Sequence, residues 1–312
     1  MTLIQLQYAI AVSEYLNFTL AAQKSFVTQP TLSMQIQKLE QELNVEIFDR
    51  NTHPMTLTPI GKKLIAQAKV IVNEAKKMQH LVYEEQNTMS GTITLGIIPT
   101  ILPTLLPLFY KNFVKNYPKI NLKIKELKTE NIVESLKSGT IDFGIAATPL
   151  YDEAIVEKVM YFEPLVAYFP PELVPEKKRI QDDELNVAQL ILLEEGHCFR
   201  ENVLNICKSN SLKNRNIDLD SGSFQTIIKL VNDGFGMTLL PLLQANELTE
   251  IDKKNIRSFT KPEPTREISL IYHQSQLRIS FANAFVKLVQ SIIRGMLYLE
   301  SDNIAAPKLR LK

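Results

Sequence analysis

The feature that most constrains this 312-residue chain is an apolar stripe that continues at helical spacing over roughly 30 residues. Apolar side chains recur there at steps of three or four, at Ile60, Leu64, Ala68, Ile71, Ala75, Met78 and Val82. The stripe predicts one helix over 59–89, roughly 45 Å long, with a seam for a partner helix. A helix buried in its own domain is the less favoured alternative, because its other faces carry Lys62, Lys63, Lys69, Lys76 and Lys77. We therefore expect this long helix to pack against a partner helix.

Three short helical patterns precede the long helix. The first covers residues 3–13, the second starts from a cap at Thr19, and the third has Pro30 in its first turn. Three helices with a tight turn before the third are typical of a helix-turn-helix. Segments 45–50 and 56–58 then predict a small two-stranded wing.

The third helix, capped by Thr28 or Gln29, has two distinct faces. The inward stripe is formed by Leu32, Ile36, Leu39 and Leu43. The outward arc carries side chains suited to base edges and phosphates, namely Thr31, Ser33, Met34, Gln37 and Lys38. This arc, with Arg50 near the tip of the wing, is a candidate DNA-reading surface.

The net charge of this segment does not favour nucleic acid. Residues 1–58 contain three Lys or Arg and five Asp or Glu, which gives −2, whereas DNA-binding modules are usually basic. On charge alone, a protein-binding helical module is an equal interpretation. DNA binding would require Lys38 and Arg50 to be concentrated on one face.

Three runs of residues, 18–23, 27–50 and 57–61, closely resemble the winged helix-turn-helix of LysR-type transcriptional regulators. The resemblance covers residues 1–65 and implies a DNA-binding domain over 1–58 and a linker and dimerisation helix over 59–89. It implies that the DNA-binding residues are Gln29, Thr31, Ser33, Met34, Gln37, Lys38 and Arg50. Gln37 stands where many members of the family have arginine.

Beyond Met89-Ser90-Gly91, strand and helix patterns alternate. Strands are expected at 92–98, 121–127, 142–147 and 267–273, and helices at 105–117, 132–139 and 281–299. Such alternation is typical of an α/β domain with a largely parallel sheet. The order resembles the two-lobed, periplasmic-binding-protein-like regulatory domain of LysR-type regulators, with lobe I over 90–162 and 266–312 and lobe II over 163–265.

Both cysteines, Cys198 and Cys207, lie in one segment of lobe II. Cys198 has His197 before it and Arg200 two residues after it, and such neighbours favour the reactive thiolate. A helical face formed by Phe199, Val203, Ile206 and Cys207 predicts a helix that begins near Cys198. That helix would hold the two cysteines roughly 13–14 Å apart along its axis, whereas a disulfide needs Cα atoms within about 4.4–6.8 Å. A disulfide would therefore unwind the helix; the alternative is that both thiols are inert, small apolar residues.

Several motifs make this half similar to that of the hydrogen-peroxide-sensing LysR-type regulators. They are Met89–Gly91, Leu95–Thr100, Glu195–Arg200, Cys207, Gly234–Pro241 and Lys261–Arg266. The resemblance implies that Cys198 is the peroxidatic cysteine and Cys207 its resolving partner. It also implies a peroxide-binding site formed by Thr100, Thr129, His197, Arg200 and Arg266.

The chemistry that this resemblance implies uses neither a cofactor nor a metal. The Cys198 thiolate attacks the O–O bond of hydrogen peroxide and becomes a sulfenic acid, which condenses with Cys207 to a disulfide. Repacking of residues 198–207 would change the arrangement of a homodimer or homotetramer on promoter DNA. RNA polymerase is the further partner that the family implies.

Composition sets the remaining expectations. Two cysteines are too few for a secreted disulfide scaffold, and the start of the chain lacks the pattern of a signal peptide, so we expect a cytoplasmic protein. The apolar run 93–109 is broken by Gly96 and three prolines and is too short for a membrane span. The main alternative function is a LysR-type regulator with a small organic effector bound between the lobes. A thiol peroxidase and a solute-binding transport protein are less favoured, and we expect a regulator rather than an enzyme.

Overall fold

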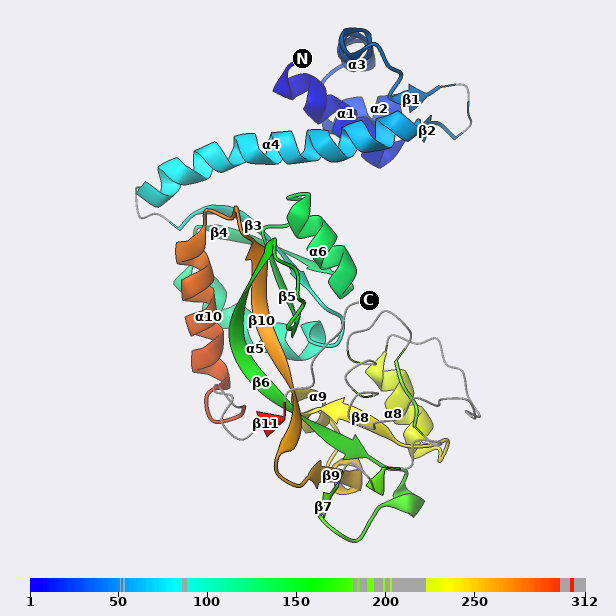
Figure 1. The fold of residues 1–312 in the computed structure, drawn as a ribbon, viewed down its shortest axis with the longest axis vertical. Coiled ribbons are helices and arrows are strands. Elements are labelled where there is room, and N and C mark those ends of the chain that lie inside the picture. Colours follow the sequence, from blue (N-terminus) through cyan, green and yellow to red (C-terminus); the bar gives the residue numbers. More distant parts are fainter. Residues whose placement is uncertain are drawn as a thin grey trace. The chain divides into compact units, whose positions relative to one another are not determined.

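The structure is a computed structural model, which describes residues 1–50, 52, 54–85, 89–181, 184–185, 190–193, 199, 203, 223–297 and 304–305. The chain forms two compact units (Figure 1). The N-terminal unit comprises Met1–Thr88 with Ser135–Thr140, and the C-terminal unit comprises Met89–Glu134 with Ile141–Lys312.

Four helices and one small hairpin make up most of the N-terminal unit. They are α1 (Leu3–Tyr15), α2 (Phe18–Lys24), α3 (Gln29–Leu43), β1 (Phe48–Asp49), β2 (Thr56–Leu57) and α4 (Pro59–Glu85). The strands β1 and β2 pair antiparallel, which confirms the predicted wing. Of the two predicted caps of α3, Thr28 is the cap and Gln29 is the first helical residue. The predicted cap at Thr19 is wrong, because the Asn17 side chain accepts the N–H of Leu20 at 2.9 Å and caps α2 two residues earlier.

The core of the N-terminal unit includes the first half of α4. Leu32, Ile36 and Leu39 of α3 are buried, as the stripe predicted. The same core takes in Ile65, Ala68 and Val72 of α4, with Leu64 and Ile71 packed against it. This half of α4 therefore packs on its own unit, as in the less favoured alternative, whereas Ile60 and Met78 of the predicted seam are exposed.

A close approach of two backbone segments fixes where α4 begins. The Thr58 hydroxyl accepts the N–H of Gly61 at 2.9 Å and donates to the carbonyl oxygen of Glu46 at 2.7 Å. A Cβ atom on Gly61 would lie 2.0 Å from the carbonyl oxygen of Ile47, so only glycine fits there. The wing is thereby locked to the first turn of α4.

Lobe I of the C-terminal unit is built on three parallel strands and three helices. The strands are β3 (Gly91–Ile97), β4 (Ile120–Glu126) and β5 (Phe143–Thr148), in the order β4-β3-β5. The helices are α5 (Leu102–Asn116), α6 (Thr129–Lys137) and α10 (Ile279–Ile293). Phenylalanines pack α5 against α10, with the rings of Phe109 and Phe285 5.2 Å apart. Ile132 of α6 fills the space over the paired glycines Gly96 and Gly144, where a Cβ atom on Gly144 would lie 2.4 Å from it.

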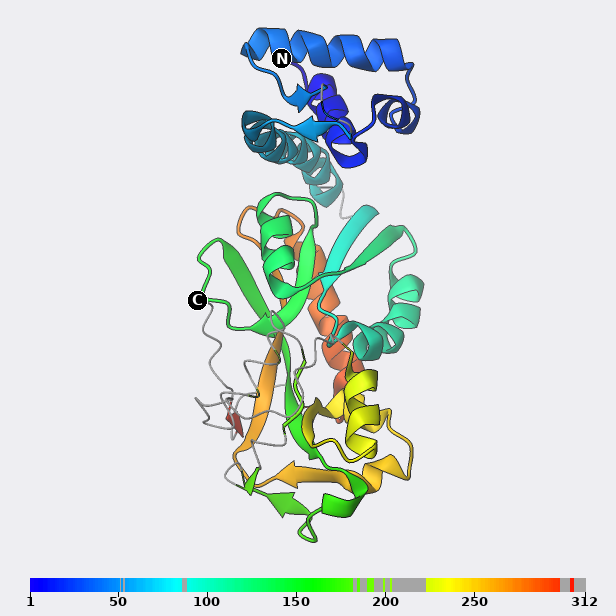
Figure 2. The same ribbon diagram turned by 90° about the vertical axis from the view of Figure 1, so that its right-hand side faces the viewer.

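Two long strands cross between the lobes, as Figure 2 shows. They are β6 (Ile155–Tyr168) and β10 (Glu263–His273), which pair antiparallel. In lobe I, β10 pairs antiparallel with β5. In lobe II, β6 pairs antiparallel with β8 (Thr238–Pro241) and β9 (Ile256–Phe259). The prediction of a largely parallel sheet is therefore right for β3, β4 and β5 but wrong for the crossing strands, because a chain that leaves lobe I and returns must run in both directions.

Lobe II also contains shorter elements. They are η1 (Pro171–Leu173), β7 (Arg179–Ile180), α8 (Phe224–Asn232), α9 (Leu242–Asn246) and η4 (Asp252–Asn255). Near the end of the chain, β11 (Ile304–Ala305) returns to pair in parallel with the start of β10, at Glu263 and Pro264. Phe199 and Val203 have helical backbone and are buried in the lobe II core, as their predicted helical face requires. Within the part of the chain that the structure describes, none of the helices is both long and apolar enough to cross a bilayer.

Candidate functional sites

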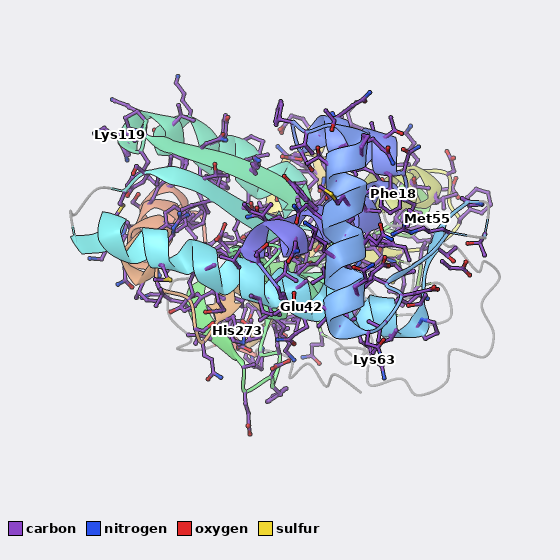
Figure 3. The ribbon with its side chains drawn as sticks, turned by 90° about the horizontal axis from the view of Figure 1, so that it is seen from above. Phe18, Glu42, Met55, Lys63, Lys119 and His273 are labelled. Carbon is purple, nitrogen blue, oxygen red and sulfur yellow. The ribbon has the colours of Figure 1, made fainter. Side chains whose placement is uncertain are left out.

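The outward arc of α3 is an exposed polar surface. Gln29, Thr31, Met34, Gln37 and Lys38 are exposed, and Ser33 is half-buried. Figure 3 looks onto this helix, which lies in front of the other elements of the N-terminal unit. The arc therefore presents amide, hydroxyl, thioether and ammonium groups along one uncovered helix face, which suits contacts with base edges and phosphates.

Hydrogen bonds fix the start of α3. The hydroxyl of Thr28 accepts the N–H of Thr31 at 3.4 Å, and the two threonine hydroxyls are 2.8 Å apart. Farther along, the Gln35 side-chain oxygen accepts from the side-chain amide of Gln5 in α1 at 3.3 Å. The helix is thus held from beneath while its outward arc stays accessible.

Arg50, predicted to contact DNA from the wing, is held by other residues of the N-terminal unit. Its Nη2 lies 2.8 Å from Oε2 of Glu40, which belongs to α3. Its guanidinium carbon also lies 5.0 Å from the centre of the Phe18 ring in α2. Figure 3 labels Phe18 beside α3. The wing is therefore joined to both helices of the helix-turn-helix by one side chain.

Thr100 and Thr129 occupy equivalent places in lobe I. Each lies three residues beyond the end of a strand, β3 ending at Ile97 and β4 at Glu126. These two strands are parallel neighbours, and Ile97 is the register partner of Glu126. Both threonines are buried. The carboxyl edge of parallel strands is where α/β sheets usually bind ligands, so the structure brings the two predicted hydroxyls to one such edge.

Arg266 lies buried beside this edge and contacts both Glu163 and Thr100; this group of contacts is called the Arg266 junction. On β10, its Nε and Nη2 lie 2.9 and 2.8 Å from Oε2 of Glu163 on β6. Its Nη1 donates to the hydroxyl of Thr100 at 3.0 Å, and its Nη2 to the carbonyl oxygen of Thr100 at 3.1 Å. The guanidinium therefore fixes both the backbone and the side chain of Thr100.

The same junction reaches lobe II through two further contacts. Oε1 of Glu163 accepts the N–H of Leu243 in α9 at 3.0 Å. The ring of Phe199 lies 5.6 Å from the guanidinium carbon of Arg266 and packs edge-on against Phe224 of α8. Cation–π contact of this kind is attractive when the pair is shielded from water. One ion pair thus links both lobes and both crossing strands.

Two groups of this junction, Glu163 and Tyr161, were not predicted from the sequence. Burial raises the pKa of Tyr161 well above its usual value, and the Glu163 carboxylate raises it further, whereas Arg266 opposes the shift. Its hydroxyl has no hydrogen-bond partner among the described residues and remains protonated, hence able to donate. The available signal was a lone glutamate in the apolar run of β6, because a buried carboxylate needs a partner.

A second buried polar cluster lies on the opposite face of β10. Thr148, at the end of β5, donates to Oε1 of Glu267 at 2.6 Å, and its hydroxyl is 2.6 Å from that of Ser269. Glu267 and Ser269 alternate with Arg266 along the strand, so they point away from it. We had no sequence signal for this cluster, because Thr148 is distant along the chain from its partners.

The structure therefore brings together Thr100 and Arg266, with Thr129 at the same sheet edge. The other predicted peroxide and redox residues, His197, Cys198, Arg200 and Cys207, lie outside the described residues. Among the residues that the structure does describe, no group of three or more His, Cys, Asp or Glu could hold a metal ion.

Comparison with protein families assigns both units. Residues 3–62 match the bacterial regulatory helix-turn-helix protein family of the lysR type, and residues 86–293 match the LysR substrate binding domain. The chain is 32% identical over 273 residues to the hydrogen peroxide-inducible genes activator of Pectobacterium carotovorum, covering 87% of this chain and 90% of that protein. It is 35% identical over 277 residues to the HTH-type transcriptional regulator EstR of Acinetobacter baylyi, covering 88% and 91%.

A solved structure contains the same elements. Full-length OxyR from Pseudomonas aeruginosa, in a cysteine-to-aspartate variant, superposes with a TM-score of 0.76 at 30% identity, and the match covers 93% of this chain and 98% of that one. The winged helix-turn-helix, the long α4 and the two-lobed domain are thus shared with a regulator of that class.

Proposed function

Because this chain belongs to the LysR family of bacterial transcriptional regulators, we propose that it is a regulator that detects hydrogen peroxide through Cys198 and a reversible Cys198–Cys207 disulfide. The proposal rests on relatives named as hydrogen peroxide-inducible activators and as OxyR. It rests equally on the two cysteines, nine positions apart in the chain.

The N-terminal unit reads promoter DNA through α3. The exposed side chains of Gln29, Thr31, Met34, Gln37 and Lys38, with Ser33, contact base edges and phosphates. Domain limits of 1–58 for this module and 59–89 for the linker helix follow the family pattern. A homodimer formed along α4 presents two such surfaces to a two-fold symmetric site.

The contact between Phe199 and Arg266 is the observation that carries the peroxide proposal. Phe199 follows Cys198 directly in the chain, and its ring lies over the guanidinium that holds Thr100. The Thr100 hydroxyl accepts from Arg266, so its own proton can be donated to a peroxide oxygen. Thr129 lies at the same sheet edge, and His197 and Arg200 are the sequence neighbours of Cys198 that complete the site.

The redox chemistry runs in two balanced steps. The Cys198 thiolate attacks one peroxide oxygen, the O–O bond breaks, and hydroxide leaves as Cys198 becomes a sulfenic acid. The Cys207 thiol then attacks that sulfur and releases water, which leaves a disulfide. Hydroxyl donors at Thr100 and Thr129 stabilise the negative charge on the departing oxygen.

The disulfide changes how the subunits are arranged on DNA. Lobe I over 90–162 and 266–312 and lobe II over 163–265 share the Arg266 junction, so repacking of residues 198–207 strains contacts of both lobes. A homotetramer on the promoter then respaces its reading domains and alters contact with RNA polymerase. The protein acts in the cytoplasm, where thiols are kept reduced until peroxide arrives.

Thiol trapping tests the redox proposal. Reduced full-length protein is treated with hydrogen peroxide, alkylated and mapped by mass spectrometry; the expected product is a crosslink between the peptides of Cys198 and Cys207. Cys198→Ser should abolish both the crosslink and the peroxide-dependent change in the DNA footprint. A footprint that changes while both thiols stay free would overturn the proposal.

The role of Thr100 is tested by a matched pair of substitutions. Thr100→Val removes the hydroxyl that Arg266 holds, and we expect disulfide formation to slow by about 10–100-fold. Thr104→Val is the control, because Thr104 is equally buried but its hydroxyl bonds the carbonyl of Ile101. Equal rates in the two variants would remove Thr100 from the proposed site.

A regulator that responds to a small organic effector is the second candidate. The observation in its favour is the similarity to EstR, at 35% identity compared with 32% for the hydrogen peroxide-inducible genes activator of Pectobacterium carotovorum. In that case both cysteines are inert, and Cys198→Ser retains regulation. Measurable peroxide turnover with an added reductant would instead indicate an enzyme.

A further inference from the structure

The guanidinium of Arg50 is engaged on two sides. One N–H side meets the Glu40 carboxylate at 2.8 Å, and one flat face lies over the Phe18 ring at 5.0 Å. Charge-assisted hydrogen bonds of this length are strong. A DNA phosphate that binds Arg50 would have to compete with Glu40 and Phe18 for the guanidinium, or bind it together with them.

Glu40 binds more than Arg50. Its Oε1 accepts the N–H groups of Ile47 and Phe48 at 2.8 and 3.2 Å, while its Oε2 takes the guanidinium. Only 11% of its side chain is exposed. Glu40 belongs to α3, whereas Ile47 and Phe48 lead into β1. One carboxylate therefore ties the recognition helix, α3, to the start of β1 and, through Arg50, to the residue that follows β1.

Apolar packing supports the same junction. The Phe18 ring, which faces the Arg50 guanidinium, meets the ring of Phe48 edge-on at 5.8 Å. Phe48 is buried, so its ring cannot shift without opening the core of the unit. Three elements, α2, α3 and the wing, are thus held in one arrangement by Glu40, Arg50 and two phenylalanines.

We propose that Glu40 and Arg50 are positioning residues that set the wing relative to the recognition helix, and that Arg50 is not a phosphate contact. This revises the direct DNA contact that the family resemblance implies for Arg50. It also explains how Glu40 can lie on the helix that faces DNA. Arg50 neutralises its charge, and its oxygens accept hydrogen bonds from the wing.

The pairing of Arg50 with Glu40 changes how many cations of the N-terminal unit can bind phosphate. Of the three cations in residues 1–58, Arg50 is matched by Glu40, which leaves Lys24 and Lys38 for phosphates. Each phosphate contact contributes a slope of about −0.9 to log K against log salt concentration. A phosphate-binding Arg50 would therefore change this slope when replaced, whereas a positioning Arg50 would change affinity alone.

The experiment uses reduced full-length protein and a DNA duplex selected from a random-sequence pool by the wild-type protein. Glu40→Gln, Arg50→Gln and the double variant are titrated at several salt concentrations. Glu14→Gln is the matched control, because Glu14 is exposed, lies in the same unit and changes net charge by the same amount. Lys38→Gln calibrates the slope change of a phosphate contact.

We expect Glu40→Gln to weaken binding about tenfold, although it removes a negative charge, because a charge-assisted bond is lost. Arg50→Gln should weaken binding to a similar extent with an unchanged salt slope, and the double variant should be no weaker than either single one. Hydroxyl-radical footprints of these variants should lose protection at the wing contact while α3 protection persists. Glu14→Gln should bind as well as the wild type.

Two results would overturn the proposal. In the first, Glu40→Gln binds DNA as tightly as the wild type or more tightly, and the salt slope of Arg50→Gln is shallower by about 0.9 per contact. Arg50 would then contact a phosphate. The second is uniform loss of the whole footprint together with a lowered thermal midpoint, which would indicate general unfolding. Because the assay uses reduced protein, neither result depends on the peroxide proposal.

Discussion

The two units of this chain each contain an Arg–Glu pair at the same separation, in very different surroundings. Arg50 and Glu40 lie 2.8 Å apart in the N-terminal unit with 42% and 11% of their side chains exposed. Arg266 and Glu163 also lie 2.8 Å apart, with 1% of each exposed. Each guanidinium additionally faces a phenylalanine ring, Phe18 or Phe199. The local chemistry is the same, so burial is what separates them.

Water decides what each pair contributes. Around Arg50, solvent can replace a lost partner, so such a pair adds little to stability and serves mainly to orient the wing. Around Arg266, no solvent is available, and removal of one partner leaves an uncompensated buried charge. The buried pair also holds Thr100 and the N–H of Leu243. A change there is therefore transmitted to both lobes.

The largest expected effect comes from breaking the buried pair. Glu163→Ala or Arg266→Ala should lower the free energy of unfolding by about 3–5 kcal/mol, because each leaves one unpaired buried charge. Urea unfolding of the reduced full-length protein, followed by circular dichroism, measures this loss. The double replacement Glu163→Leu/Arg266→Met should restore much of it, because no charge is left without a partner. Losses below about 1 kcal/mol in both single variants would mean that water reaches the site, as at an exposed pair.

An intermediate effect is expected at the partly exposed pair of Arg50 and Glu40. A double-mutant cycle on Glu40→Gln and Arg50→Gln should give a coupling free energy of about 0.5–1 kcal/mol, because one of the two side chains is open to solvent. Thermal and urea unfolding provide the four stabilities that the cycle needs. A coupling as large as that between Glu163 and Arg266 would show that exposure does not separate the two pairs.

The smallest effect on stability should come from Glu157, a half-buried carboxylate close enough to Glu267 to feel its charge. Burial raises its pKa above the ordinary value of 4.5, the Leu150 N–H opposes the shift, and Glu267 adds to it. Stability from the protonated form is therefore present below pH 4.5 and is lost as pH rises through the raised pKa. Glu157→Gln should raise the thermal midpoint at pH 7.5 but not at pH 4.5. Glu153→Gln is the control, because Glu153 is exposed. An equal change in thermal midpoint in both variants would show that burial of Glu157 is not the cause.

Much of the fold could be predicted from local patterns. The α3 stripe of Leu32, Ile36 and Leu39 is buried as expected, because helical spacing fixes which side chains share a face. The cap at Thr19 was wrong because Asn17 offers an equally good acceptor two residues earlier. The segment that packs against the apolar stripe of α4 could not be predicted. An apolar helix face indicates that it is buried, but not which segment buries it. In the structure, the first half of α4 packs against α1, α2 and α3 of the same chain.

The candidate site was predicted residue by residue but not as a junction. Thr100 and Arg266 were identified separately by resemblance, and their contact across 166 positions of the chain was not. Glu163 was overlooked, although it is the one charged residue in the apolar second part of β6, residues 159–168, and a carboxylate in such a run is a signal for a buried partner.

By itself, the sequence determined the helix-turn-helix, the long helix α4, the α/β character of the second unit and the position of the cysteine pair. Those features depend on spacing and residue type within a few turns of chain. Only the tertiary structure decided that Arg266 is neutralised by Glu163 while it holds Thr100, that Arg50 is held by Glu40, and that the crossing strands run antiparallel. The physical reason is that charge pairing and burial depend on which distant segments meet.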